Sequence, residues 1–163
     1  MIAPAVGDEL ARGDDGLLRE ERRLTVARHP SAILLNRDGS RLFVASGSTD
    51  HVAVVDTKSG QVVARLLDPP PAGPHEGATP NAIALSDDET RLFAAEADAN
   101  AVAVFDLSSR TSGRPQAAGN DSLAGRIPSG WYPSAVLALG DTLVVANGKG
   151  SGSLANPGGP QPI

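Results

Sequence analysis

The stretch of sequence that decides the fold runs from residue 30 to residue 60 and reads PSAILLNRDGSRLFVASGSTDHVAVVDTKSG. Residues 80–110 read PNAIALSDDETRLFAAEADANAVAVFDLSSR, and 14 of the 31 aligned positions are identical. Unrelated segments of this length would match at roughly two positions, so the chain contains an internal repeat. A third, shorter copy begins at Pro133, where residues 132–136 parallel residues 29–33.

Each full copy predicts short strands separated by turn residues. The third strand of the copies, residues 52–55 and 102–105, is apolar at every position, so both of its faces must be buried. Four-stranded sheets that cover one another on both faces are typical of the stacked blades of a β-propeller. In the first copy the strands are expected at about residues 31–36, 41–46, 51–56 and 61–67.

The sequence therefore predicts an all-β fold, a partial β-propeller with about two full four-stranded blades plus two incomplete ones. A propeller usually needs four to eight blades to close around its axis, so both ends of the segment are expected to lie in unfinished blades. The expected divisions are the end of a preceding blade at 1–28, a blade with an inter-blade insertion at 29–78, a blade with a hairpin insertion at 79–131, and the start of a further blade with a Gly/Pro-rich tail at 132–163.

Composition excludes several classes of function. The net charge of -5 opposes binding to nucleic acid or to an anionic membrane, and no apolar run is long enough to span a bilayer. The absence of cysteine excludes disulfides, thiolate catalysis and cysteine-ligated zinc. The expected partners are the neighbouring blades of the same parent chain or a second copy of the segment, with no nucleic acid and no membrane span.

The three histidines do not form a metal-binding motif. His29 occupies the position before the first strand of a blade, which Thr79 and Tyr132 fill in the other copies. His51 begins a strand, and His75 lies in a proline-rich insertion. Their spacing fits no helical or hairpin zinc site. No catalytic, cofactor-binding or metal-ligating residue is predicted in this segment, and no cofactor.

One face of the chain is a candidate for ligand binding. Trp131 and Tyr132 form the only aromatic pair and stand just before an innermost strand, where propellers line their central funnel. Packing between blades is the main interpretation of this pair, and stacking on a ligand at the mouth of the funnel is the second. The candidate ligand-face residues are Trp131, Tyr132, His75, Asn147 and Lys149.

Several stretches resemble known families. The repeated order of Pro, Ala-Ile, Asp-Gly, Arg-Leu-Phe-Val-Ala and Val-Ala-Val-Val-Asp resembles the YVTN-type β-propeller repeat of bacterial and archaeal surface and secreted proteins. The resemblance covers about 29–160 and implies a periplasmic or extracellular location. Residues 77–86, 97–104, 125–133 and 145–150 are similar to the propeller of bacterial two-part proteins that also carry a C-terminal phosphoesterase domain of the alkaline phosphatase superfamily.

The predicted function is that of a non-catalytic β-propeller segment, a structural or binding module that the resemblance assigns to a larger phosphoesterase-like protein. The segment itself is expected to catalyse nothing, whereas the resemblance implies a metal-dependent hydrolase for the parent. One alternative is a propeller hydrolase of lactonase type, in which three or more His, Asp, Glu and Arg side chains would meet within hydrogen-bond reach at the funnel. The other alternative is a surface-adhesion or assembly module.

Overall fold

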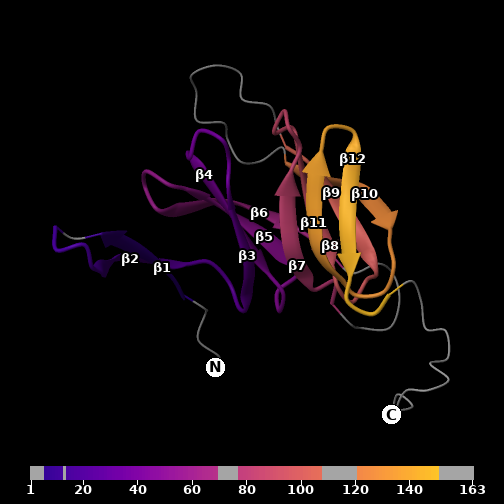
Figure 1. Cartoon of the computed structure of the whole chain (residues 1–163), viewed down its shortest axis with the longest axis horizontal. Coiled ribbons are helices and arrows are strands. Elements are labelled where there is room, and N and C mark those ends of the chain that lie inside the picture. Colours follow the sequence, from indigo (N-terminus) through magenta and orange to yellow (C-terminus); the bar gives the residue numbers. More distant parts are fainter. Residues whose placement is uncertain (1–5, 13, 70–76, 108–120, 151–163) are drawn as a thin grey trace, which may run out of the picture.

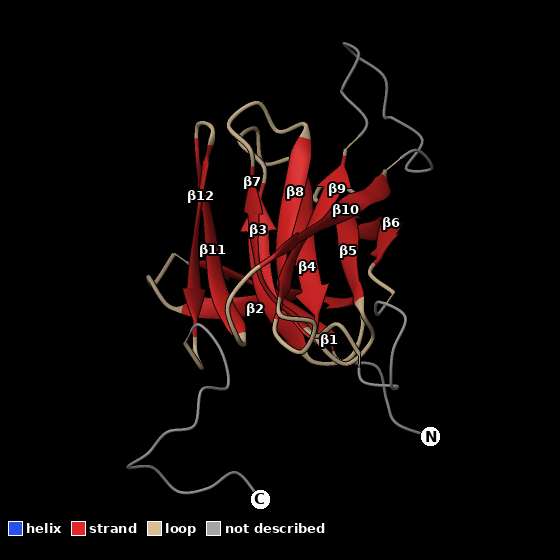
Figure 2. Ribbon diagram, turned by 90° about the vertical axis from the view of Figure 1, so that its right-hand side faces the viewer, coloured by secondary structure: helices blue, strands red, loops and turns tan. Residues whose placement is uncertain are grey.

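The computed structural model describes residues 6–12, 14–69, 77–107 and 121–150. All regular structure in these ranges is β-strand (Figure 2), which confirms the predicted all-β class. No helix capable of crossing a membrane is formed by these residues. The strands are β1 (Val6–Arg12), β2 (Leu18–Thr25), β3 (Pro30–Leu35), β4 (Arg41–Ser46), β5 (His51–Asp56), β6 (Gln61–Leu67), β7 (Pro80–Leu85), β8 (Arg91–Glu96), β9 (Ala101–Asp106), β10 (Ser122–Pro128), β11 (Pro133–Leu139) and β12 (Thr142–Asn147).

The strands form antiparallel sheets that follow one another in chain order (Figure 1). Strands β3-β4-β5-β6 make one complete blade, here called blade A, and β7-β8-β9-β10 make the next, here called blade B. The two-stranded β1–β2 sheet precedes blade A, and the two-stranded β11–β12 sheet follows blade B. The partial propeller predicted from the repeat is therefore observed, with β1 as a strand that the sequence did not predict.

The apolar third strand of each blade is buried on both faces, as its sequence predicts. In β5, Val52 and Val54 belong to a core shared with blade B, whereas Ala53 and Val55 belong to a core shared with the β1–β2 side. None of these four side chains is more than 1% exposed. A strand without a polar face is stable here because a neighbouring sheet covers each side of it.

The largest apolar core fills the space between blades A and B, and smaller cores join the two hairpins to the blades. Phe93 and Ala138 lie in the core between blade B and β11–β12, and Val26 and Val44 lie in the core between the chain after β2 and blade A. The core between the blades contains Phe43, Ala45, Val52, Val54 and Leu66 from blade A, and Leu92, Ala94, Ala103, Phe105 and Leu107 from blade B.

A repeated polar contact also joins each blade to the next. Asp50 Oδ1 accepts a hydrogen bond from the N–H of Thr79 at 3.1 Å, and Asn100 Oδ1 accepts one from the N–H of Tyr132 at 2.8 Å. Asp50 and Asn100 are equivalent in the repeat and have left-handed backbone, with φ of 46° and 53°. Asp and Asn tolerate this conformation better than other side chains do, so the contact fixes the start of the next blade's first strand.

Substitution of Val54 by Asp should lower the free energy of unfolding by roughly 3–5 kcal/mol, because it places an unpaired charge in the core between the blades. Val63 lies on the outer strand of blade A and is 44% exposed, so Val63→Asp is the matched control and should cost about 0.5 kcal/mol or less. Urea denaturation of both variants provides the measurement. Equal losses in the two variants would show that the assigned burial is wrong.

Candidate functional site

The residue before the first strand of each blade, here called the leading residue, is held in a special backbone conformation. The leading residues are His29, Thr79 and Tyr132, with φ of 50°, 54° and 59°. The carbonyl oxygen of each accepts a hydrogen bond of 2.8–3.0 Å from the backbone N–H at the same position of the loop after the second strand. A left-handed conformation is uncommon for such side chains, and here the surrounding hydrogen bonds impose it.

The side chains of the first two leading residues each contact a partner in that loop. His29 Nδ1 lies 2.6 Å from Ser48 Oγ, and Thr79 Oγ1 donates a hydrogen bond to Asp98 Oδ2 at 2.5 Å. Ser48 and Asp98 are equivalent in the repeat, and both are exposed. The same position therefore presents a polar pair to solvent in both blades. The pair is an imidazole with a hydroxyl in blade A, and a hydroxyl with a carboxylate in blade B.

The third leading residue completes this series, here called the leading-residue row. Lys149 Nζ lies 4.5 Å from the centroid of the Tyr132 ring, which is the geometry of a cation–π contact. The inner strands that follow lie side by side, since Ser31 Oγ donates to Pro80 O at 2.7 Å between β3 and β7. The row consists of His29, Ser48, Thr79, Asp98, Tyr132 and Lys149.

Most of the ligand-face residues predicted from sequence come together at one end of this row. The N–H of Lys149 donates to Trp131 O at 3.0 Å, and the Lys149 ammonium covers Tyr132. Asn147 packs against the loop just before Trp131, and its Oδ1 is buried without a hydrogen-bond partner among the described residues. Trp131 is 41% exposed. His75 lies outside the described residues, and ligand binding by the other four stays a prediction.

The structure also brings together three charged residues that sequence analysis missed. Arg126 Nε donates to Glu96 Oε1 at 2.8 Å and to Oε2 at 2.9 Å, and Arg126 Nη2 donates to Asp68 Oδ1 at 3.0 Å. Glu96 ends β8, Arg126 lies on β10, and Asp68 follows β6 of the preceding blade. Both acidic side chains are fully buried, so this charge cluster ties blade A to blade B.

The charge cluster contains two acidic side chains and one basic side chain, and the pKa of one of the two carboxyls is raised. Burial raises the pKa of Asp68 to about 8, and the neighbouring Glu96 carboxylate adds to the increase, against the opposing effect of Arg126. At neutral pH Asp68 therefore keeps its proton. The Asp68, Glu96 and Arg126 side chains do meet within hydrogen-bond reach, in the space between blades A and B.

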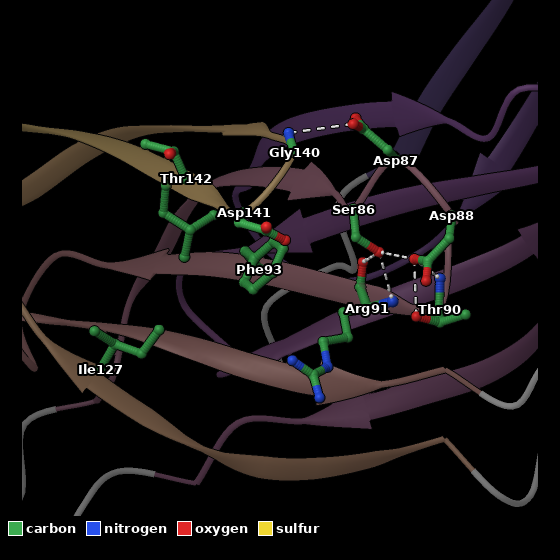
Figure 3. Close-up of a pocket in the computed structure, with 11 residues that line it drawn as sticks. Ser86, Asp87, Asp88, Thr90, Arg91, Phe93, Ile127, Gly140, Asp141 and Thr142 are labelled. Atoms are coloured by element: carbon green, nitrogen blue, oxygen red, sulfur yellow. Dashed lines mark hydrogen bonds between the residues drawn. The ribbon is translucent and has the colours of Figure 1, made fainter.

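A pocket of about 640 Å³ opens at the opposite end of blade B, beside the turn between β11 and β12 (Figure 3). Asp88 Oδ1 accepts hydrogen bonds from the hydroxyls of Ser86 and Thr90 at 2.7 and 2.8 Å, and these bonds lower the pKa of Asp88 to about 2. Asp87 Oδ2 accepts a hydrogen bond from the N–H of Gly140 at 3.1 Å. The carboxylates of Asp87 and Asp88 thus stabilise turns, and no group of three or more His, Asp or Glu among the described residues could hold a metal ion.

The chain matches the model of the family described as Lactonase, 7-bladed beta-propeller. The match extends over residues 14–127, from the β1–β2 turn through most of β10. No curated protein matches the chain.

Several solved structures share the fold. A protein from Lactobacillus plantarum is 27% identical with a TM-score of 0.62, and the match covers 85% of this chain and 40% of that one. The periplasmic gluconolactonase of Pseudomonas aeruginosa is 21% identical with a TM-score of 0.57, covering 84% of this chain and 35% of that one. Hydrazine synthase of Kuenenia stuttgartiensis is 24% identical with a TM-score of 0.57, and the match covers 72% of this chain and 29% of that one. The chain therefore spans well under half the length of these structures.

The buried charge cluster predicts a specific pH dependence of stability. Folded Asp68 keeps its proton up to about pH 8, whereas an unfolded aspartate loses it near the ordinary value of 3.8, so folding takes up a proton between these values. The contribution of Asp68 to stability is thus fully present below about pH 4 and is lost as the pH rises toward 8. The side chain of residue 68 cannot titrate in Asp68→Asn, so the free energy of unfolding of this variant should fall less steeply as the pH rises. The slope should differ from that of the native chain by up to about 1.4 kcal/mol per pH unit.

Urea denaturation at several pH values between about 5 and 7.5 measures this difference. The control is Asp98→Asn, because Asp98 is exposed and lies outside the charge cluster. The native chain and the control should share one slope. The same slope in Asp68→Asn would contradict the assigned protonation of the cluster.

Proposed function

Because the chain belongs to the lactonase family of seven-bladed β-propellers, we propose that it forms part of a propeller that hydrolyses a sugar lactone. The family favours this alternative over a non-catalytic module. The similarity to a periplasmic gluconolactonase supports the choice of substrate class. The chain spans 35% of that enzyme's length, so the activity is proposed for the assembled ring, to which this chain contributes two blades and two half-blades.

The leading-residue row carries the proposal, because it gathers the groups that a sugar lactone requires. A lactone of this kind is a hydroxyl-rich ring with one polar carbonyl group. Aromatic faces such as those of Trp131 and Tyr132 can stack on the ring, and a few fixed polar groups can orient its hydroxyls. Asp98 of blade B accepts a hydrogen bond from Thr79, and Asn100, two residues later in the same loop, holds the Tyr132 N–H, so the loop that carries Asp98 contacts the loop that carries Tyr132.

The proposed reaction is attack of water on the lactone carbonyl. The Asp98 carboxylate takes a proton from the water as the new C–O bond forms, and the Lys149 ammonium stabilises the oxyanion of the tetrahedral intermediate. Collapse of the intermediate breaks the ring C–O bond. The released alkoxide takes up the proton, and the product is an open-chain hydroxy acid.

Substitution of Asp98 by Asn should lower the rate of δ-gluconolactone hydrolysis by at least tenfold, since general-base catalysis contributes roughly 10²–10⁴-fold. A pH-stat follows the acid released, with spontaneous hydrolysis subtracted. Asp87→Asn is the matched control, because Asp87 is also exposed and accepts a single hydrogen bond, but at the turn end of blade B. The assay uses the assembled ring, and a native rate no higher than buffer, or an equal loss in the control, would overturn the proposal.

A binding module that performs no chemistry is the second candidate. It is favoured by the charge cluster, whose acidic side chains are buried and hold two blades together. It is also favoured by the leading side chains, which are hydrogen-bonded within their own blades. In this case the module would belong to a larger protein with YVTN-type repeats and a phosphoesterase domain. Calorimetry that detects heat of binding for the lactone or for gluconate, with no acid release, would favour it.

A further inference from the structure

Thr79 of the leading-residue row is held in a conformation that its side chain disfavours. Its φ of 54° lies in the left-handed region, where β-branched side chains are rare. Such a residue persists only where its surroundings impose the conformation, and strain of this kind concentrates at functional sites. The contacts that impose the strain on Thr79 therefore point to its role.

Each hydrogen-bonding group of Thr79 has a partner, and the partners lie on both blades. The N–H donates to Asp50 Oδ1 at 3.1 Å, and the carbonyl oxygen accepts from the N–H of Ala97 at 3.0 Å. The hydroxyl donates to Asp98 Oδ2 at 2.5 Å. Asp50 precedes β5 of blade A, whereas Ala97 and Asp98 follow β8 of blade B. Thr79 is thus fixed at three points, and its hydroxyl is held toward Asp98.

Asp50 is anchored so that its carboxylate reaches across the contact between the blades. Its carbonyl oxygen accepts a hydrogen bond from the N–H of Asp68 at 2.8 Å, which ties it to the end of β6. A Cβ atom at Gly77 would lie 2.7 Å from both carboxylate oxygens of Asp50. Glycine at this position therefore lets the chain that leads to Thr79 pass directly beside the Asp50 carboxylate.

The loop that carries Asp98 is fixed at its start. The N–H of Asp98 donates to Ala78 O at 3.3 Å, and Ala78 is fully buried. Glu96, two residues earlier, is held by Arg126 in the charge cluster. The backbone near Asp98 thus has little freedom, whereas the Asp98 side chain is exposed. The hydrogen bond from the Thr79 hydroxyl restrains this exposed side chain.

We propose that Thr79 and Asp50 are positioning residues for Asp98, an inference that rests on the lactone hydrolysis proposed above. The Thr79 hydroxyl binds Oδ2 of the carboxylate, which leaves Oδ1 to take the proton from water. Asp50 acts one step further away, because it fixes the backbone of Thr79. The general base of blade B is therefore aimed by blade A, and it is in place only when the two blades pack in register.

The leading residue of blade B differs in this respect from those of its neighbours. The side chain of His29 contacts the Ser48 hydroxyl, and the ring of Tyr132 contacts the Lys149 ammonium. Neither of these contacts orients a carboxylate. Among the three leading residues, Thr79 is the one whose side chain can orient a general base.

Substitution of Thr79 tests the positioning role in the assembled ring. Thr79→Val keeps the shape of the side chain and removes its hydroxyl. It should lower kcat for δ-gluconolactone roughly tenfold and change KM less than about twofold, because misplacing a catalytic group by about 1 Å can cost 10²-fold. Thr79→Ser keeps a hydroxyl and should recover most of the rate.

Thr90→Val is the matched control. The Thr90 hydroxyl donates to Asp88 Oδ1 at 2.8 Å, so the same substitution removes the same kind of hydrogen bond at the turn end of blade B (Figure 3). This variant should keep the native kcat. A loss equal to that of Thr79→Val would overturn the inference, because it would show a general effect on the blade.

Substitution of Asp50 tests the contribution of blade A. Asp50→Ala removes the acceptor of the Thr79 N–H and should lower kcat in the same way as Thr79→Val. Asp50→Asn keeps an acceptor oxygen, as Asn100 provides one for the Tyr132 N–H, and should restore most of the rate. Equal losses in both Asp50 variants would overturn the role of this residue.

A double variant shows whether Thr79 acts through Asp98. If it does, Thr79→Val combined with Asp98→Asn should be no slower than Asp98→Asn alone, because the two residues act as one unit. Losses that multiply would overturn the inference. An unchanged kcat in Thr79→Val beside a slow Asp98→Asn would overturn this inference and leave lactone hydrolysis standing, whereas an inactive native ring would overturn both.

Discussion

The structure depends on apolar contact between the faces of successive sheets. Val54 of blade A and Phe105 of blade B meet in the core between the blades, and neither is more than 1% exposed. Each Å² of apolar surface removed from water contributes about 25 cal/mol, so a face left open is costly. This constraint explains why the central strands have no polar face.

Polar contacts act on top of this packing and set the exact alignment of the sheets. The Asp50 and Asn100 side chains bind the residue before the first strand of the following sheet. These hydrogen bonds form because the apolar packing places the sheets in register. Buried charges contribute little net stability, since desolvation offsets their attraction, so the Arg126 cluster serves mainly to align the blades. The leading residues are positioned by the same contacts. The surface proposed to bind a lactone is therefore a consequence of blade stacking.

The repeat allowed most of the fold to be predicted, because strands that are apolar on both faces leave few other arrangements. Strand β1 was missed, since the sequence VGDELAR lacks the apolar pattern of its counterparts. The proximity of Trp131 and Lys149 follows from their places at the two ends of one hairpin. The charge cluster was missed because its members lie on three separate strands or strand ends of two blades. Its one sequence signal is Glu96, which stands where the other copies have Ser46 and Asn147.

Hydrogen exchange of individual backbone amides tests the central claim, that the sheets are stabilised by cover on both faces. The account predicts the slowest exchange in β5 and β9, which lie inside complete blades and are almost entirely buried. It predicts much faster exchange in β1 and β2, whose sheet has two strands in the part of the chain that the structure describes. Equal protection in β2 and β5, or rapid exchange throughout β5 and β9, would contradict the stacked-blade account.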